Sequence, residues 1–269
     1  MSKTLTILGC GTMGRAVLGG LVASRFAEDW NIRVTDLYQE TVTRLMEEFP
    51  VEGSTDNAVA VRGADVVLLA TKPHVALKVI GDLGSALDGC LLISVCAGVT
   101  LSQLARLAPG ARCVRAMPNT PALIREGMTI LSLDPKATEE DATLAEAIFS
   151  AVGRVRVLPE SNIDACTGLA GSGPAFVFTM LDAMADGGVK MGLKRDVATE
   201  LAAQTMLGAA RLVLESGEHP AVLRDRVTTP AGCTIAGLFR LEEGALRSTI
   251  GQAVAEAARV AGTLGDETS

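Results

Sequence analysis

The chain contains 269 residues, of which 48% are hydrophobic and 20% are charged. This length accommodates two domains, and this composition excludes an intrinsically disordered chain. The net charge is −7 and no run of basic residues occurs, so a nucleic acid is not an expected partner.

Membrane insertion, export and metal binding are not expected either. No uncharged apolar run is long enough to span a bilayer, and the start of the sequence lacks the features of a signal peptide. The six cysteines are scattered, without a Cys-x-x-Cys pair that would indicate a zinc site or a redox dithiol. We therefore expect a cytoplasmic protein with no metal site and no membrane contact.

Residues 1–160 alternate between short apolar runs and stretches with helical spacing. Each run is apolar on both faces, which is typical of parallel strands covered by helices on both sides. The pattern predicts an α/β domain with a doubly wound parallel sheet of the Rossmann type. The expected strands are Thr4–Leu8, Ile32–Thr35, Val66–Ala70, Leu91–Val95, Arg112–Ala116, Thr129–Leu133 and Val155–Leu158, and the expected helices include Thr41–Phe49, Leu101–Leu107 and Glu139–Ala151.

Residues 161–269 have a different character, because strand signals stop after Pro159. Gly173-Pro174 opens a long helical segment, where a proline in the first turn costs no hydrogen bond. Further helices are expected at Arg195–Ser216 and Glu242–Leu264. The first two helices are apolar on nearly all faces, which a domain of about 110 residues cannot bury alone. We therefore predict a second, all-α domain that packs against a second copy of itself.

The segment after the first strand has the spacing Gly-x-Gly-x-x-Gly and opens a helix. In a dinucleotide-binding fold the first glycine allows a sharp turn, the second lets a pyrophosphate approach, and the third lets the helix pack closely on the strand. The helix N-terminus then offers free N–H groups to phosphates. The alternative is an ordinary glycine-rich turn without a ligand. The predicted cofactor-binding residues here are Gly9, Cys10, Gly11, Thr12, Met13 and Gly14.

Asp36 ends the second predicted strand. An acidic residue at this place accepts hydrogen bonds from the adenosine ribose and repels a 2′-phosphate. No arginine occupies the next few positions, so Asp36 mildly favours NADH over NADPH. The alternative is that Asp36 caps the following helix, together with Gln39.

Two further loops follow predicted strand ends, where ligands collect in open α/β sheets. In Ala70-Thr71-Lys72-Pro73, we expect Lys72 near the phosphate or ribose oxygens of a cofactor; the alternative is a solvated lysine beside a loop-forming proline. In Met117-Pro118-Asn119-Thr120-Pro121, two prolines stiffen a polar loop that suits a nicotinamide, although a structural turn would look the same.

Side chains for acid–base or nucleophilic catalysis are scarce. The two histidines are weak candidates, because His74 only follows the cofactor-side loop and His219 lies in a predicted turn between helices. No nucleophile elbow occurs in the sequence. The most constrained polar stretch of the second half is Val227–Ile235. Its threonines and the N–H groups of a helix start form either a pocket for a carboxylate or a helix N-cap that binds no ligand.

Several segments, in this order along the chain, resemble the pyrroline-5-carboxylate reductase family. The Met-Pro-Asn-Thr-Pro and Gly-Ser-Gly-Pro-Ala-Phe sequences are the most specific, and the resemblance covers nearly the full length. The segments are Gly9–Gly14, Ala70–Pro73, Arg115–Pro121, Gly168–Phe178 and Arg224–Leu238, followed by Leu241-Glu242.

The resemblance implies hydride transfer from NADPH or NADH to the cyclic imine 1-pyrroline-5-carboxylate, which gives L-proline in the last step of proline biosynthesis. It also implies a helical domain that interleaves in a homodimer, often a ring of five dimers (a decamer), and an active site shared between two chains. Asn57 would join Lys72 and the Met117–Thr120 loop on the cofactor. The substrate-binding residues would be Thr229, Gly232, Cys233 and Thr234, and Thr234, against the ring nitrogen, would be the catalytic residue.

The chain departs from the family in this turn. The common form is Pro-Gly-Gly-Thr-Thr, whereas here Ala231 restricts a backbone angle that glycine leaves free and Cys233 replaces a hydroxyl by a weaker donor. Two other functions remain. One is a related imine or hydroxy-acid reductase of the same architecture, and the other is a non-enzymatic dinucleotide-sensing module. The polar turn argues against the second.

Overall fold

The computed structural model describes residues 3–264, and this part of the chain divides into two compact units. The residues up to Ser172, together with those from Glu256 on, form the first unit. Gly173–Ala255 form the second. The C-terminal helix α12 (Leu246–Thr263) therefore begins in the second unit and ends in the first.

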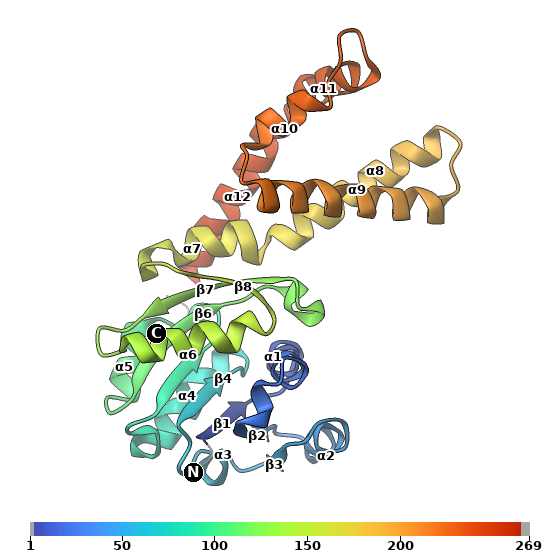
Figure 1. The fold of residues 1–269 in the computed structure, drawn as a ribbon. Helices are drawn as coiled ribbons and strands as arrows, with labels where there is room; N and C mark the ends of the chain where they lie inside the picture. Colours follow the sequence, from blue (N-terminus) through green and yellow to red (C-terminus); the bar gives the residue numbers. More distant parts are fainter. Residues whose placement is uncertain (1–2, 265–269) are drawn as a thin grey trace. The chain divides into compact units, whose positions relative to one another are not determined.

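The first unit is built on an eight-stranded sheet with the order β3-β2-β1-β4-β5-β6-β7-β8 (Figure 1). Neighbouring strands are parallel except for β6 and β7, which are antiparallel. The strands are β1 (Lys3–Leu8), β2 (Trp30–Thr35), β3 (Glu52–Ser54), β4 (Val66–Leu69), β5 (Leu91–Ser94), β6 (Arg112–Met117), β7 (Gly127–Leu133) and β8 (Gly153–Val157).

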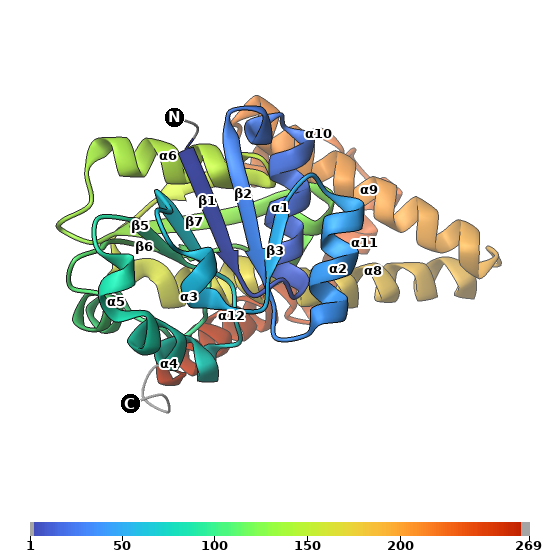
Figure 2. The same cartoon turned by 90° about the horizontal axis from the view of Figure 1, so that it is seen from below.

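Helices cover both faces of this sheet (Figure 2). Leu18 of α1 (Thr12–Ala23), Leu45 of α2 (Gln39–Glu48) and Phe149 of α6 (Glu139–Ser150) are buried in one hydrophobic cluster. Ile80 of α4 (Pro73–Leu83) and Leu104 of α5 (Leu101–Leu107) are buried in the other. The doubly wound α/β architecture predicted from the apolar runs is confirmed.

Short turns complete the first unit. The helix α3 (Asn57–Ala60) follows β3, and 3-10 turns occur at Phe26–Glu28, Gly84–Leu87, Thr120–Ile124 and Glu160–Asn162. The chain then enters α7 (Ile163–Cys166), which continues through a π-helical segment, Thr167–Gly171.

Three features of the fold differ from the sequence expectation. The short strand β3 was not predicted, because three residues give no measurable alternation. The strand β7 is antiparallel to β6, because only the short turn Thr120–Ile124 joins them and a parallel neighbour needs a long crossover. The helix expected at Glu242–Leu264 is divided at Ala245, whose φ of 53° is left-handed and ends a helix.

The second unit consists of helices. They are α8 (Gly173–Lys190), α9 (Arg195–Ser216), α10 (Pro220–Arg226), α11 (Cys233–Glu243) and the first part of α12. The helices α8 and α9 pack against each other. Among the described residues of this unit, only Ala185, Ala198 and Ala202 are buried hydrophobics. Large apolar side chains remain exposed, including Phe178, Met184, Leu201, Leu212 and Phe239. A single copy therefore leaves much of this unit's apolar surface in contact with water.

Candidate functional site

Four loops lie at the carboxyl edge of the central strands. Because β1, β4, β5 and β6 are adjacent and parallel, the segments that follow them end at the same edge of the sheet. These segments are Gly9–Gly14, Ala70–Pro73, Val95–Thr100 and Met117–Asn119. This edge is where open α/β sheets bind ligands.

The glycine loop after β1 has the geometry of a nucleotide cradle. Gly9 has a φ of +87°, which glycine adopts without strain. A Cβ on Gly14 would collide with the carbonyl oxygen of Gly9, so this glycine is needed for close packing of α1. At Gly11 the exposed position has no atom within 4 Å of an added Cβ. Gly11 is also the N-cap of α1 and supplies no side chain to the helix N-terminus, which stays open to a phosphate.

Asp36 is fastened to the glycine loop. Its Oδ2 accepts a hydrogen bond from N of Cys10 at 3.2 Å, and its Oδ1 accepts one from N of Tyr38 at 3.2 Å. The N-cap of α2 is Tyr38, so the alternative reading of Asp36 as the helix cap is wrong. Burial, together with the charge of Asp36, raises the pKa of the Cys10 thiol to about 12. Cys10 is therefore an uncharged packing residue at neutral pH.

Two further polar candidates of this half, Asn57 and Lys72, lie near the ends of β2 and β4. Oγ1 of Thr35, the last residue of β2, donates a 2.6 Å hydrogen bond to Oδ1 of Asn57. Lys72 is exposed and is the N-cap of α4, whose first residue is Pro73.

Thr71 has a buried hydroxyl without a partner. Within residues 3–264, its Oγ1 and that of Thr129 are the two buried side-chain polar atoms that form no hydrogen bond. A buried hydroxyl left unpaired costs free energy unless a ligand or water pairs with it. The unpaired Thr71 hydroxyl and the open face of Gly11 therefore fit a bound dinucleotide.

Asn119 is engaged by two parts of the chain. Its Oδ1 accepts a 2.8 Å hydrogen bond from N of Met128, in β7. Its Nδ2 donates a 3.0 Å hydrogen bond to O of Ala170, in the π-helical segment. A Cβ on Gly171 would lie 3.3 Å from Cε of Met117, so the π-helical segment lies close to the end of β6.

The loop Val95–Thr100 was missed by the sequence analysis. Sγ of Cys96 donates to O of Thr71 at 3.2 Å, which joins this loop to the Ala70–Pro73 loop. Thr100 and Gln103 form a capping box at the start of α5. That Thr-x-x-Gln pattern is visible in the sequence and could have located the loop.

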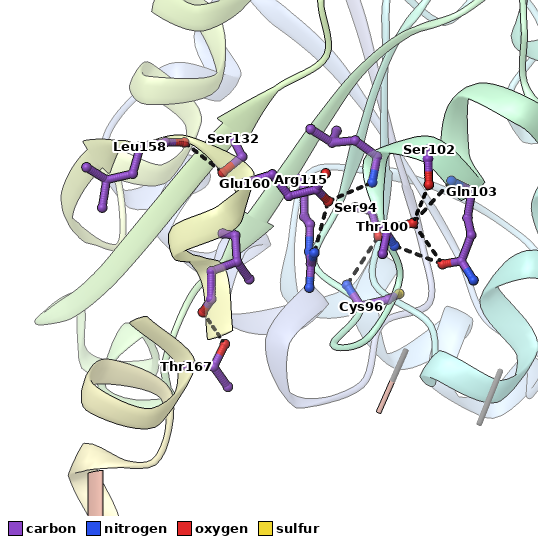
Figure 3. A network of polar contacts seen from close by, with 12 residues as sticks. Ser94, Cys96, Thr100, Ser102, Gln103, Arg115, Ser132, Leu158, Glu160 and Thr167 are labelled. Atoms are coloured by element: carbon purple, nitrogen blue, oxygen red, sulfur yellow. Dashed lines mark hydrogen bonds and ion pairs between the residues drawn. The ribbon is translucent and has the colours of Figure 1, made fainter. Parts of the chain in front are cut away.

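Glu160 was missed as well. Its side chain joins β6 to the start of α5 (Figure 3). Its Oε1 accepts hydrogen bonds from Nη1 of Arg115 and from N of Leu101, the first residue of α5. A Cβ on Gly98 would lie 3.0 Å from O of Leu264, so the residue that follows α12 lies close to this loop too. No local sequence pattern predicts these contacts between residues far apart in the chain.

The turn Thr229–Thr234 lies in the second unit. N of Gly232 donates to O of Thr229 at 3.1 Å, and a Cβ on Gly232 would collide with Oγ1 of Thr229. Ala231 has a φ of 57°, the left-handed conformation that glycine adopts more readily. Thr234 follows the exposed Cys233, the first residue of α11. Gly232, the N-cap of α11, forms no side-chain cap, so the helix start offers N–H groups to an anion.

The two histidines lie in different units of the chain. His74 is exposed in the first turn of α4. His219 is the N-cap of α10, and its Nδ1 accepts a hydrogen bond from N of Ala221 at 3.2 Å. In the part of the chain that the structure describes, no cluster of three or more His, Cys, Asp or Glu side chains could hold a metal ion. No helix of residues 3–264 is long and apolar enough to cross a membrane.

Comparison with known proteins agrees with this geometry. Residues 160–264 match the family of pyrroline-5-carboxylate reductase dimerisation domains, and residues 4–98 match a family described as NADP oxidoreductase, coenzyme F420-dependent. A pyrroline-5-carboxylate reductase of Schizosaccharomyces pombe is 44% identical over 278 residues, which cover 96% of this chain and 98% of the relative. One of Escherichia coli is 39% identical over 256 residues, covering 94% and 95%.

Solved structures give the same result. A pyrroline-5-carboxylate reductase of Coxiella burnetii has a TM-score of 0.93 at 35% identity, covering 98% of this chain and 99% of the other. The pyrroline carboxylate reductase of Plasmodium falciparum, solved with NADP bound, has a TM-score of 0.86 at 27% identity, covering 98% of each chain.

The Rossmann sheet, its open glycine loop and the attached dimerisation domain define an NAD(P)-dependent oxidoreductase that forms a homo-oligomer. Within this class, the chain belongs to the pyrroline-5-carboxylate reductase family.

Proposed function

We propose that this chain reduces 1-pyrroline-5-carboxylate to L-proline with NADPH or NADH. The observation that carries the proposal is the combination of the nucleotide cradle at Gly9–Gly14 with full-length similarity to pyrroline-5-carboxylate reductases. When bound, a reduced nicotinamide supplies the hydride. A protonated cyclic imine is already electrophilic at C5, so the addition needs no strong side-chain acid.

The residues of the chain then act by placement. The open N-terminus of α1 holds the pyrophosphate, and Thr71 offers its unpaired hydroxyl to the cofactor. N–H groups of Gly232–Thr234 hold the substrate carboxylate, and the Thr234 hydroxyl orients the ring nitrogen. Holding the reacting carbons about 3–3.5 Å apart supplies much of the rate enhancement in such a reaction.

The test of the activity is steady-state kinetics with pyrroline-5-carboxylate and each cofactor, followed by NADH or NADPH absorbance. Other cyclic imines and several keto acids are assayed in parallel. A higher kcat/KM for one of those substrates would replace this proposal by the related reductase. Binding of a dinucleotide without turnover of any substrate would favour the non-enzymatic sensing module.

The role of Thr234 has its own test. We expect Thr234→Ala to lower kcat more than it weakens the binding of NADH, because the hydroxyl orients substrate and not cofactor. The matched control is Thr249→Ala, which removes a hydroxyl of α12 that already donates to O of Ala245. Equal losses of NADH affinity and turnover in Thr234→Ala would contradict the assignment.

The cofactor preference proposed for this chain is NADH. Support comes from Asp36, whose carboxylate lies at the glycine loop and would face a 2′-phosphate. The exposed residues that follow, Leu37 and Tyr38, carry no positive charge. Asp36→Asn keeps an acceptor for N of Cys10 but removes the charge. We expect it to shift the ratio of NADPH to NADH dissociation constants by about tenfold towards NADPH, and Glu40→Gln, in the first turn of α2, to leave this ratio unchanged.

The proposed assembly is a homodimer through the helical unit, and a decamer of five such dimers. The exposed apolar side chains of α8, α9 and α11 support the dimer. If two copies share each active site, Gly11→Val and Thr234→Ala subunits mixed after dissociation recover activity that neither variant has alone. Light scattering distinguishes a dimer from a decamer. The expected compartment is the cytoplasm, a proposal supported by six free cysteines.

A further inference from the structure

The helical run that leaves the first unit contains a widened turn. In Thr167–Gly171 the backbone is π-helical, and N of Ser172 donates to O of Thr167, five residues earlier, at 2.8 Å. A π turn is an α-helix with one extra residue, and it occurs frequently at functional sites. At its end, O of Ala170 has no N–H donor four residues further on, because that residue is Pro174, so the partner of this carbonyl has to come from elsewhere.

Asn119 provides that pairing. Its Nδ2 donates to O of Ala170 at 3.0 Å, while its Oδ1 accepts from N of Met128 at 2.8 Å. Both partners are backbone groups, one in the π-helical segment and one in β7. The neutral amide of Asn119 donates to a carbonyl and accepts from an N–H at the same time, which an ionised carboxylate cannot do.

The same amide lies at the end of the loop for which the sequence predicts a nicotinamide contact. Asn119 ends the Met117–Asn119 loop at the end of β6, and a Cβ on Gly171, the last residue of the π turn, would lie 3.3 Å from Cε of Met117. The side chain of Asn119 bonds to both β7 and the π turn. These two hydrogen bonds restrain the backbone of the Met117–Asn119 loop.

We propose that Asn119 is a positioning residue of the reductase. It holds the π turn open against the Met117–Asn119 loop and thereby sets the distance between the reacting groups, without donating or accepting the transferred proton. This inference rests on the proposed reductase activity. A small displacement of such a loop lowers turnover, because a shift of about 1 Å in reacting geometry costs up to 100-fold.

The decisive variant is Asn119→Asp, which replaces the amide by a group of almost the same shape. An ionised carboxylate can still accept from N of Met128, but it repels O of Ala170. When protonated, the same carboxyl donates to O of Ala170 and restores the pair. We therefore expect kcat to fall about tenfold at pH 8, and the ratio of variant to wild-type kcat to rise towards 1 as the pH is lowered to about 5.5.

Two further measurements separate positioning from general loss of structure. The dissociation constant for NADH, measured by fluorescence, should change by less than about threefold, because both polar atoms of the Asn119 side chain bond to the protein backbone and the Gly9–Gly14 cradle is untouched. Amide hydrogen exchange of the free protein should speed up in the peptide that spans residues 163–175, and this difference should also shrink at low pH. The matched control is Asn162→Asp, which adds the same charge at the exposed N-cap of α7.

The outcomes are distinct. A wild-type enzyme without activity on pyrroline-5-carboxylate overturns the proposed function, whereas the hydrogen-exchange result still tests the Asn119 contact. With an active wild type, a kcat ratio that does not vary with pH overturns the positioning role. So does a loss that appears only in KM, or an Asn162→Asp variant with the same profile as Asn119→Asp.

Discussion

Nη1 of Arg115 donates a hydrogen bond to Oε1 of Glu160 at 2.9 Å. The side chain of Arg115 is only 9% exposed and that of Glu160 is 32% exposed. Both residues lie in the first unit, and this ion pair ties β6 to the 3-10 turn Glu160–Asn162.

Removal of Glu160 should destabilise the protein. Glu160→Ala leaves the guanidinium of Arg115 without its partner and removes an acceptor from N of Leu101. We expect a loss of about 2 kcal/mol in the free energy of unfolding, a value reduced for the partial exposure of Glu160. Urea denaturation at a fixed protein concentration measures it.

The control for this variant is Glu28→Ala. It breaks the Arg25–Glu28 pair, whose side chains are 83% and 65% exposed, and should cost less than about 0.5 kcal/mol. Similar losses in both variants would show that the buried pair contributes no more than a surface pair.

Two glycines of the Gly9–Gly14 loop should respond differently to substitution by alanine, one in NADH affinity and the other in stability. Gly11→Ala meets open space, so the protein should fold normally but bind NADH at least about tenfold more weakly, because the new methyl group faces the pyrophosphate. Gly14→Ala collides with O of Gly9 and should unfold at a lower temperature. Thermal denaturation and NADH fluorescence, measured on both variants, check this difference. A Gly11→Ala protein with normal affinity would place the cofactor elsewhere.

Ala231 should be a site where glycine stabilises the chain. Its φ of 57° costs an L-residue about 1 kcal/mol, and Ala231→Gly removes this strain at the expense of some chain entropy in the unfolded state. We expect a net gain of about 0.5 kcal/mol in the free energy of unfolding. Ala236→Gly, inside α11, should instead cost about 1 kcal/mol. The same sign of change at both positions would contradict the left-handed conformation of Ala231.

Asp141 should make the protein sensitive to acid. Burial alone would raise its pKa, but hydrogen bonds from Arg112 and Thr138 hold the pKa of this carboxyl below its ordinary value of 3.8. A group with a lowered folded-state pKa stabilises the protein above its unfolded pKa, and this contribution is lost as the pH falls through the folded pKa. We therefore expect the free energy of unfolding to decline below about pH 4.

Asp141→Asn tests this assignment. The variant should be less stable at neutral pH by about 1–2 kcal/mol, and its stability should decline less steeply in acid than that of the wild type. Urea denaturation over a pH series provides the measurement. Glu140→Gln is the control for loss of one charge from the first turn of α6, and a slope unchanged in Asp141→Asn would refute the role of this carboxyl.

Regular elements could be predicted from the sequence because their signals are local. The helices Leu101–Leu107 and Arg195–Ser216 have the bounds expected from their apolar spacing. The glycine loop was also predictable, because its three glycines meet constraints within one strand–turn–helix unit.

Other features required contacts between distant residues. The antiparallel placement of β7 depends on which neighbour the strand joins, and the apolar run Thr129–Leu133 is the same in either direction. The acceptor role of Asp36 towards Cys10 joins residues 26 apart, and the Arg115–Glu160 pair joins residues 45 apart.

The sequence by itself determined the class of fold, the glycine turn between β1 and α1 and the family, since each of these depends on short segments with fixed spacing. Only the tertiary structure decided what Asn119, Glu160 and Asp36 hold in place. The physical reason is that a hydrogen bond depends on the distance and direction between two groups, and the folded sheet alone brings those groups together.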